Sequence, residues 1–234
     1  MSTIRLVTYN IRHGKGIDGA ISLGRIAQTL KNINADIAAL QEVDKHLPRS
    51  FLKNQAKAFA RLTSMHYAFA PNIRFFKFFF SFGNAVLSKY PIAQSGNLLL
   101  PGQKERRGLQ HCTILLPGGR KIYLFNTHLG LSTQERRIQI EALVKKIDRV
   151  PYPVLLAGDF NCAPGDNELI LLSQSLEYAA DYPVNTFPSH GAHFPIDHIY
   201  VSRHWLVTDV FTYPSTASDH LPLVCNLQLK PNML

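Results

Sequence analysis

The stretch Val154-Leu155-Leu156-Ala157-Gly158-Asp159-Phe160-Asn161 decides how the rest of this 234-residue chain is interpreted. Four apolar residues after Pro153 predict a short buried strand, because the run is too short for a helix. Gly158 is expected to let the backbone turn, and Asp159 and Asn161 then present two oxygen ligands on one side of the extended chain. Such a pair suits a hard cation or an activated water. Gly-Asp-x-Asn is also an ordinary turn sequence, so this stretch alone leaves both interpretations open.

The composition is that of a folded globular protein, with 46% hydrophobic and 18% charged residues. A chain of this length buries enough surface to form a core without disulfides. The three cysteines are scattered and show no metal-binding spacing, and no long apolar segment opens the chain, so we expect a cytoplasmic protein. The net charge of +9 favours polyanionic partners such as nucleic acid or anionic lipid, without choosing between them.

Hydrophobic spacing predicts helices and strands that alternate along the chain. Apolar residues from Leu23 to Ile33 recur at helical spacing behind Ser22 in the N-cap position, and Ser132 with Glu135 forms a capping box that opens another helix. Helices are also expected over residues 54–63 and 168–172, and strands over residues 4–11, 37–40, 67–69, 84–88, 109–116, 121–127, 196–201, 207–213 and 221–229. This mixture of hairpins and helix crossovers predicts one α/β domain over residues 1–234, with mixed sheets and helices on their outer faces.

Polar residues interrupt these apolar segments at their ends, which is where α/β folds build their sites. Each has an ordinary structural interpretation: Asn10 can cap a turn, Glu42 can be a surface acid, and His128 can be a core histidine. As a set they fit metal-assisted attack of water on phosphorus, with oxygen ligands for Mg²⁺ or Mn²⁺ and no thiolates to favour zinc. The set consists of Asn10, Glu42, His128, Asp159, Asn161, Asp197, Asp219 and His220.

Six short motifs carry these residues in a fixed order along the chain. They are Thr8-Tyr9-Asn10-Ile11, Gln41-Glu42-Val43, Asn126-Thr127-His128-Leu129, Gly158-Asp159-Phe160-Asn161, Ile196-Asp197-His198-Ile199 and Ser218-Asp219-His220-Leu221-Pro222. Together they resemble the endonuclease/exonuclease/phosphatase superfamily, and the Asn-Thr-His-Leu motif is similar to its deoxyribonuclease and sphingomyelinase branch. The resemblance spans almost the whole chain. It implies a four-layered α/β sandwich, in which two packed mixed β-sheets are flanked by helices.

The resemblance also implies a metal site and a position for the attacking water. Glu42 resembles the principal Mg²⁺ ligand of the superfamily, with Asn10 and Asp219 beside it. Mn²⁺ is expected as a substitute metal. Asp159 is expected to position or deprotonate the attacking water, and Asn161 to hold a phosphate oxygen or a metal-bound water.

The remaining assignments by resemblance concern the phosphate group. His220 is expected to donate a proton or hydrogen bond to the phosphate in the transition state, oriented by Asp197. His128 would bind the phosphate from the other side. By the same analogy, Asn84 is a candidate partner of His128, and Arg107 is a candidate substrate contact. Because adjacent residues of an extended chain point opposite ways, Asp219 and His220 can serve one site only if the backbone bends between them.

The chain contains an unusual aromatic run. Six phenylalanines occupy the eight positions that begin at Phe75 and end at Phe82, with Arg74 and Lys77 as neighbouring cations. The run is compatible with a buried strand and an aromatic loop, with a rim on which bases stack, or with insertion into a bilayer interface. Its triple phenylalanine breaks the alternation that would decide between these interpretations.

Two functions are therefore expected from the sequence. The first is a Mg²⁺-dependent nuclease that cuts phosphodiesters of DNA or RNA. The alternative is a phosphodiesterase or phosphatase that acts on a lipid headgroup, with membrane contact through residues 75–82. A non-catalytic binding module with the same fold is a third class, and the complete set of acids and histidines argues against it.

Overall fold

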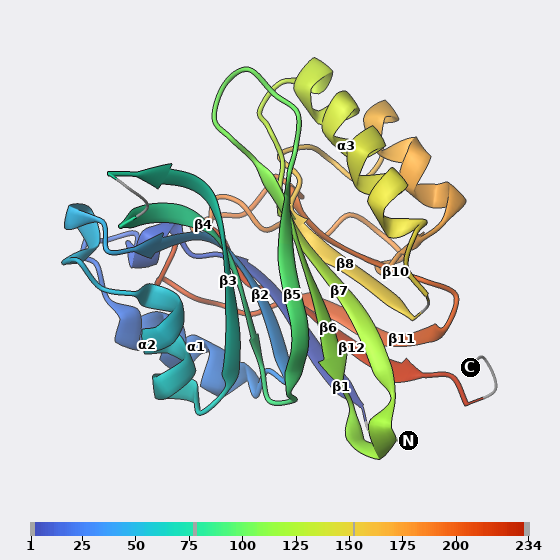
Figure 1. Ribbon diagram of the computed structural model, residues 1–234, viewed down its shortest axis with the longest axis horizontal. Helices are drawn as coiled ribbons and strands as arrows, with labels where there is room; N and C mark the ends of the chain where they lie inside the picture. Colours follow the sequence, from blue (N-terminus) through green and yellow to red (C-terminus); the bar gives the residue numbers. More distant parts are fainter. Residues whose placement is uncertain (1–2, 77–78, 152, 232–234) are drawn as a thin grey trace.

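Two six-stranded sheets pack face to face, with helices on both outer faces (Figure 1). The computed structural model describes residues 3–76, 79–151 and 153–231. This arrangement is the four-layered α/β sandwich that the motif resemblance implied, and it agrees with the prediction of mixed sheets. No helix among the described residues is long and apolar enough to cross a membrane.

The first sheet has the strand order β11-β12-β1-β2-β4-β3. Strand β1 pairs parallel to β2 and antiparallel to β12, so the sheet is mixed. The helices α1 Leu23–Ile33 and α2 Gln55–Thr63 cover its outer face, where Ile26, Leu30 and Phe59 are buried. The strands are β1 Ile4–Asn10, β2 Ile37–Lys45, β3 His66–Phe75, β4 Phe80–Ser88, β11 Trp205–Thr212 and β12 Leu223–Leu229.

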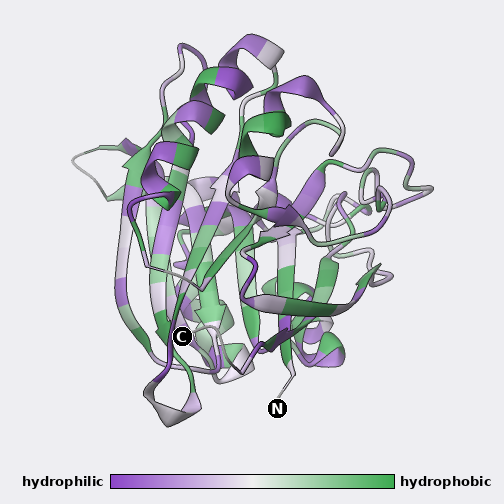
Figure 2. Cartoon of the chain, turned by 90° about the vertical axis from the view of Figure 1, so that its right-hand side faces the viewer, coloured by the Kyte–Doolittle hydropathy of each residue, from purple (hydrophilic) through white to green (hydrophobic). Residues whose placement is uncertain are grey.

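The second sheet has the strand order β5-β6-β7-β8-β10-β9, with β7 and β8 parallel. The helix α3 Thr133–Ile147 and the 3-10 helix η4 Asn167–Gln174 cover its outer face. Figure 2 shows helices with mixed purple and green segments, as expected where one side is apolar and the other polar. The strands are β5 Ile92–Leu99, β6 Gly108–Leu115, β7 Lys121–His128, β8 Val154–Asp159, β9 Glu177–Tyr178 and β10 Asp197–Val201.

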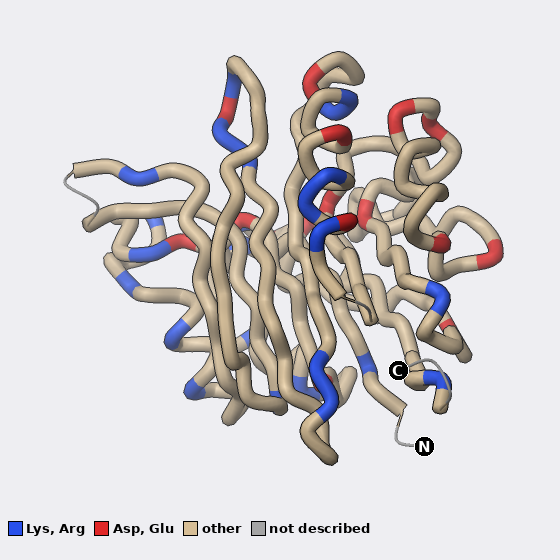
Figure 3. The backbone as a smooth tube through the Cα atoms, turned by 45° about the vertical axis from the view of Figure 1, so that its right-hand side comes forward, with Lys and Arg blue, Asp and Glu red and all other residues tan. Residues whose placement is uncertain are grey.

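The main hydrophobic core lies between the two sheets. Leu6 and Val86 of the first sheet and Leu124 and Leu155 of the second belong to one buried cluster. Figure 3 shows long tan stretches along the central strands, with charged residues mainly on helices, loops and strand ends. Polar side chains at the edge of this core are therefore held by rigid strands.

The expected helix starts are confirmed, and the stretch around Gly158 needs one correction. Ser22 and Ser132 are N-caps whose hydroxyl oxygens accept the backbone N–H of Arg25 and Glu135, respectively. Gly158 does not make the turn, because β8 continues to Asp159. A Cβ atom at Gly158 would lie 2.2 Å from the carbonyl oxygen of Thr127, so glycine is required for the close approach of β7 to β8.

A buried amide network joins the two sheets beneath their edge. The Asn126 Nδ2 group donates to the carbonyl oxygens of Leu40 and Ala85, at 3.1 and 3.0 Å, and to Gln110 Oε1 at 3.1 Å. The Asn126 Oδ1 atom accepts a hydrogen bond of 2.8 Å from Gln41 Nε2. Asn126 therefore ties β7 of the second sheet to β2 and β4 of the first.

We expect Asn126→Ala to destabilise the fold by about 3 kcal/mol or more, because each buried polar group left without a partner costs about 1–3 kcal/mol. The free energy of unfolding would be measured by chemical denaturation. Asn32→Ala is the matched control, since Asn32 is exposed on α1 and, within the part of the chain that the structure describes, its side chain makes one hydrogen bond, which it accepts from Gln28. Equal stability of the two variants would show that the network does not hold the sheets together.

Candidate active site

Residues from both sheets meet in one pocket of about 630 Å³ at an edge of the sandwich. In the second sheet, His128 at the end of β7 is paired in register with Asp159 at the end of β8, which is paired with Asp197 at the start of β10. Strand pairing thus places three of the expected residues side by side. Seven of the expected residues line the pocket: Asn10, Glu42, Arg107, His128, Asp159, Asn161 and His220.

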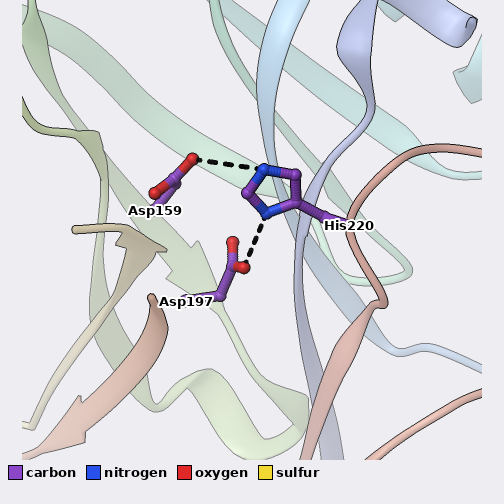
Figure 4. Close-up of side chains that lie close together, drawn as sticks. All are labelled: Asp159, Asp197 and His220. Atoms are coloured by element: carbon purple, nitrogen blue, oxygen red, sulfur yellow. Dashed lines mark hydrogen bonds and ion pairs between the residues drawn. The ribbon is translucent and has the colours of Figure 1, made fainter. Parts of the chain in front are cut away.

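His220 lies between two carboxylates (Figure 4). Its Nδ1 atom is 2.8 Å from Asp197 Oδ2, and its Nε2 atom is 3.8 Å from Asp159 Oδ2. Burial alone would lower the pKa of His220, but the charge of Asp197 and the hydrogen bond to it raise that pKa to about 10. His220 is therefore protonated at neutral pH and held in orientation by Asp197, while its role toward a phosphate stays a prediction.

His128 approaches Asp159 from a second direction and has the opposite protonation state. Its Nε2 atom lies 3.4 Å from Asp159 Oδ2. Burial lowers the pKa of His128 to about 3, because the effect of the nearby Asp159 charge is too small to offset the desolvation of the ring. The contact is thus between a neutral imidazole and a carboxylate rather than an ion pair.

Asp159 and Asn161 form a turn and face the pocket at the same time. The backbone N–H of Asn161 donates to Asp159 Oδ1 at 3.0 Å, and Asn161 has a left-handed φ of 53°. The Asn161 side chain donates to the Leu129 carbonyl oxygen at 2.9 Å. Asp159 and Asn161 both line the pocket. The turn interpretation is therefore confirmed, and the interpretation of the two residues as ligands of a cation or a water stays a prediction.

Glu42 reaches the pocket through an irregularity of β2. The register between β2 and β4 shifts between Leu40 and Val43, and Glu42 adopts a positive φ of 58°. Its Oε1 atom accepts a hydrogen bond of 3.1 Å from Asn10 Nδ2. Burial raises the pKa of Glu42, and the negative charges of Asp159 and Asp219 raise it further. The excess of negative charge at this partly buried position is suited to a cation.

The donor set around Glu42 fits a divalent cation. Carboxylate and amide oxygens are present, and the pocket lining contains no cysteine. Asp219 lies close enough to raise the pKa of Glu42, and its Oδ2 atom is 3.2 Å from Arg12 Nε. In the present orientation, Asn10 directs its Oδ1 atom to the Arg12 backbone N–H at 3.0 Å. The assignment of the metal ligands to Glu42, Asn10 and Asp219 stays a prediction.

Another group of possible ligands lies beside these residues. Single ligand atoms of Asp159, Asp197 and His220 fall within 4.8 Å of one another. The Nδ1 atom of His220 is already hydrogen-bonded to Asp197, and its protonated ring cannot bind a metal. His220 is therefore not available as a metal ligand in this state, and the Glu42 side stays the predicted place for a cation.

Arg107 and Asn84 occupy different positions. Arg107 lines the pocket, and its Nη1 atom lies 3.0 Å from Glu105 Oε1. Asn84 is buried between the sheets, where its Nδ2 atom donates to the carbonyl oxygens of Gly108 and Asn126. Asn84 is not among the pocket-lining residues, so its position connects it to the strand that carries His128 rather than to the pocket surface.

The backbone between Asp219 and His220 bends as the assignment required. The Ser218 hydroxyl group donates to the Asn10 carbonyl oxygen at 2.7 Å and accepts the His220 backbone N–H at 3.4 Å. The hydroxyl thus anchors this loop to the end of β1. Sequence reasoning missed two arginines, because no motif contains either of them. Arg12 contacts Asp219, and Arg49 lines the pocket.

Comparison with known proteins identifies the family of this chain. The model of the Endonuclease/Exonuclease/phosphatase family matches residues 7–220. This chain belongs to that family. Its membership supports hydrolysis of a phosphoester bond and the use of a divalent metal, without identifying the substrate or the metal. The comparison with curated proteins found no match.

Solved structures of several other proteins share the fold. An endonuclease/exonuclease/phosphatase from Beutenbergia cavernae superposes with a TM-score of 0.81 at 21% identity, over 98% of this chain and 72% of that chain. A Bacteroides thetaiotaomicron mannosyl-6-phosphatase gives 0.79 at 20% identity, over 97% and 100%. The human Nocturnin catalytic domain with bound sulfate gives 0.74 at 21% identity, over 97% and 95%.

We expect Asp197→Asn to move the alkaline limb of the pH–rate profile to lower pH by at least one unit. Loss of the Asp197 charge lowers the pKa of His220, so the donor loses its proton earlier as pH rises. The profile of kcat/KM and an NMR titration of His220 would measure the shift. Asp209→Asn, at an exposed position on β11, is the control. An unmoved limb would show that His220 protonation does not govern turnover.

Proposed function

We propose that this protein is a metal-dependent phosphodiesterase that uses water to attack phosphorus. The proposal depends on one observation. One pocket is lined by Glu42 from the first sheet and by Asp159 and His128 from the second. His220 lines the same pocket and is hydrogen-bonded to Asp197. This combination of a carboxylate, a neutral imidazole and a protonated imidazole supplies a base, a phosphate contact and a proton donor within one volume.

The chain's own groups divide the work as follows. Asp159 orients the attacking water and accepts its proton. His220, protonated and held by Asp197, donates to a non-bridging phosphate oxygen as negative charge develops there. Asn161 and the neutral His128 bind the phosphate, and the bond to the leaving oxygen breaks on the side away from the water. A divalent cation held at Glu42, with Asn10 and Asp219, would neutralise the phosphate and the leaving oxygen.

We expect Glu42→Gln to lower kcat by on the order of 10² or more, because it removes the carboxylate proposed to hold the cation. EDTA should abolish hydrolysis by the wild-type enzyme, and added Mg²⁺ or Mn²⁺ should restore that hydrolysis. Calorimetry with Mn²⁺ would show weaker binding to the variant, while thermal unfolding would remain cooperative. Glu177→Gln, at an exposed position on β9, is the control. Substantial metal-dependent hydrolysis by Glu42→Gln would remove the ligand assignment.

A phosphodiester of DNA or RNA is the first substrate class that we propose. The net charge of +9 favours a polyanion, and aromatic rings near the pocket offer stacking surfaces. The His46 and Phe79 rings stack with centroids 5.0 Å apart. Three buried free thiols, at Cys112, Cys162 and Cys225, are consistent with the cytoplasmic location that we propose.

A phosphoester in a lipid headgroup is the second candidate, and the exposed phenylalanines favour it. Figure 1 shows the ends of β3 and β4 extending at one side of the molecule. Phe76 is 83% exposed there, and Phe79 and Phe75 are 58% and 49% exposed, whereas Lys77 and Phe78 lie outside the described residues. Because Phe75 also lines the pocket, a bilayer contacted by this hairpin would lie close to the catalytic residues.

Salt dependence and a double variant would separate the two substrate classes. Binding to DNA or RNA should weaken steeply as salt rises, because counterions are released from the phosphates. Binding to anionic vesicles through the hairpin should survive salt and be lost in Phe76→Ser/Phe79→Ser. Hydrolysis of plasmid DNA, RNA, sphingomyelin and a phosphoinositide would be measured with Mg²⁺ at two salt concentrations. Leu206→Ser, at another exposed apolar position, is the control.

Hydrolysis of a lipid alone, with loss in the double variant and not in the control, would overturn the nuclease proposal. Hydrolysis of nucleic acid alone, unaffected by the double variant, would overturn the lipid alternative.

A further inference from the structure

Arg49 is held in an unusual way at the pocket. It lies in the 3-10 turn Pro48–Ser50, which follows β2, and lines the same pocket as Glu42. Its Nε atom donates to Asp44 Oδ2 at 2.9 Å, and its Nη2 atom donates to Asp44 Oδ1 at 2.8 Å. The Asp44 side chain is fully buried, whereas the Arg49 side chain is 48% exposed. A buried carboxylate thus holds one edge of an accessible guanidinium.

Two further contacts restrict the geometry. The Arg49 guanidinium carbon lies 5.0 Å from the centre of the Phe82 ring, so an aromatic face supports the guanidinium. The Asp44 backbone N–H donates to Gln55 Oε1 at 2.9 Å, and Gln55 Nε2 donates to the His13 carbonyl oxygen at 2.7 Å. The anchor is therefore fixed to α2 and to the segment after β1, and the position of Arg49 is set before any ligand arrives.

The guanidinium retains unused donors. A guanidinium has five N–H groups, and the two bonds to Asp44 use two of them; among the described residues Arg49 makes no further hydrogen bond. Removing a carboxylate from water costs considerable free energy. If the pair served structure alone, we would expect both partners to be buried. Here the arginine remains accessible inside the pocket, with N–H groups suited to a phosphate.

The scissile phosphate already has donors elsewhere in the pocket. His220, Asn161 and Arg107 line it together with the Glu42 position that fits a cation. Arg49 comes from a separate segment whose neighbours in the lining, Leu47 and Pro48, carry no side-chain donor. An additional preorganised guanidinium at that segment is suited to a second anionic group on the same substrate.

We propose that Arg49 forms a second anion subsite, which binds a phosphate group of the substrate other than the one that is hydrolysed. This proposal rests on the proposed function, because it takes the phosphate at Asp159 as the reacting one. The shared chemistry is a substrate with two phosphates. A polynucleotide supplies it through its neighbouring phosphodiester, and a phosphorylated lipid headgroup supplies it through a second phosphate.

Inhibition by bisphosphates of graded length would test the subsite. Alkanediol bisphosphates with three to eight carbons, and the monophosphates of the same lengths, would compete with bis(p-nitrophenyl) phosphate in the presence of Mg²⁺. We expect at least one bisphosphate to bind about tenfold or more tightly than its monophosphate, as for an added charge-assisted contact. Arg49→Gln should abolish this ratio, and Arg49→Lys should reduce it, because lysine cannot bond Asp44 in the same fork geometry.

Two variants guard against misinterpretation. Arg61→Gln, at an exposed position on α2, should keep the ratio and controls for loss of one positive charge. Arg49→Gln leaves Asp44 buried without its partner and can unfold. The double variant Asp44→Asn/Arg49→Gln removes both charges, should fold, and should also lose the ratio. A bisphosphate advantage that persists in this folded double variant would overturn the subsite.

Failure of the subsite and failure of the proposed function give different results. Hydrolysis without any bisphosphate advantage overturns the subsite and leaves the phosphodiesterase standing. Absence of hydrolysis overturns the proposed function, while calorimetry of the same inhibitor pairs still decides the Arg49 subsite. Two further pairs of compounds identify the source of the second phosphate. One pair is a dinucleotide with and without a terminal phosphate, and the other is a short-chain phosphatidylinositol with and without a ring phosphate. The source is the class whose pair shows a difference that depends on Arg49.

Discussion

The Asn10 side chain joins the two halves of the site, and the remaining geometry depends on this link. Its Nδ2 group donates to Glu42 Oε1 at 3.1 Å within the first sheet and to Asp159 Oδ2 at 2.9 Å in the second. Two carboxylates that would repel each other are thereby bridged by one amide. The bridge is possible only because the sheets are packed in a fixed relation, which the Asn126 network maintains below.

Environment gives the two histidines opposite properties around one acid. His128 is buried, and the charge of Asp159 offsets only part of the desolvation of the ring, so the pKa of His128 falls to about 3. His220 is equally buried, but Asp197 lies 2.8 Å away and raises its pKa to about 10. Asp159 therefore sits between a neutral ring and a cationic ring. In the proposed function, such a difference would separate phosphate binding from proton donation without any difference in residue type.

The pocket rim combines cationic and apolar character. Arg49 is anchored by the buried Asp44 and supported by Phe82, while Phe75 belongs both to the lining and to the exposed hairpin. The candidate site residues are thus surrounded by segments that differ in charge and exposure. Because binding residues are commonly carried on loops held by a rigid scaffold, the substrate preference of the proposed enzyme is expected to reside in such rim segments.

The sequence by itself determined the helix caps and the mixed sheets with helices outside, because these follow from local spacing and local hydrogen bonds. Ser22 and Ser132 are examples, since a cap involves only residues three positions apart. The four layers and the set of site residues were implied by the resemblance of six motifs to a known family. Tertiary structure decided what depends on distant partners. The bulge that turns Glu42 into the pocket and the requirement for Gly158 against Thr127 arise from strand pairing. The raised pKa of His220 arises because the loop before β12 brings its ring to Asp197 of β10. Arg49 acquired its place through Asp44 and Phe82, a combination with no periodic signal in the chain.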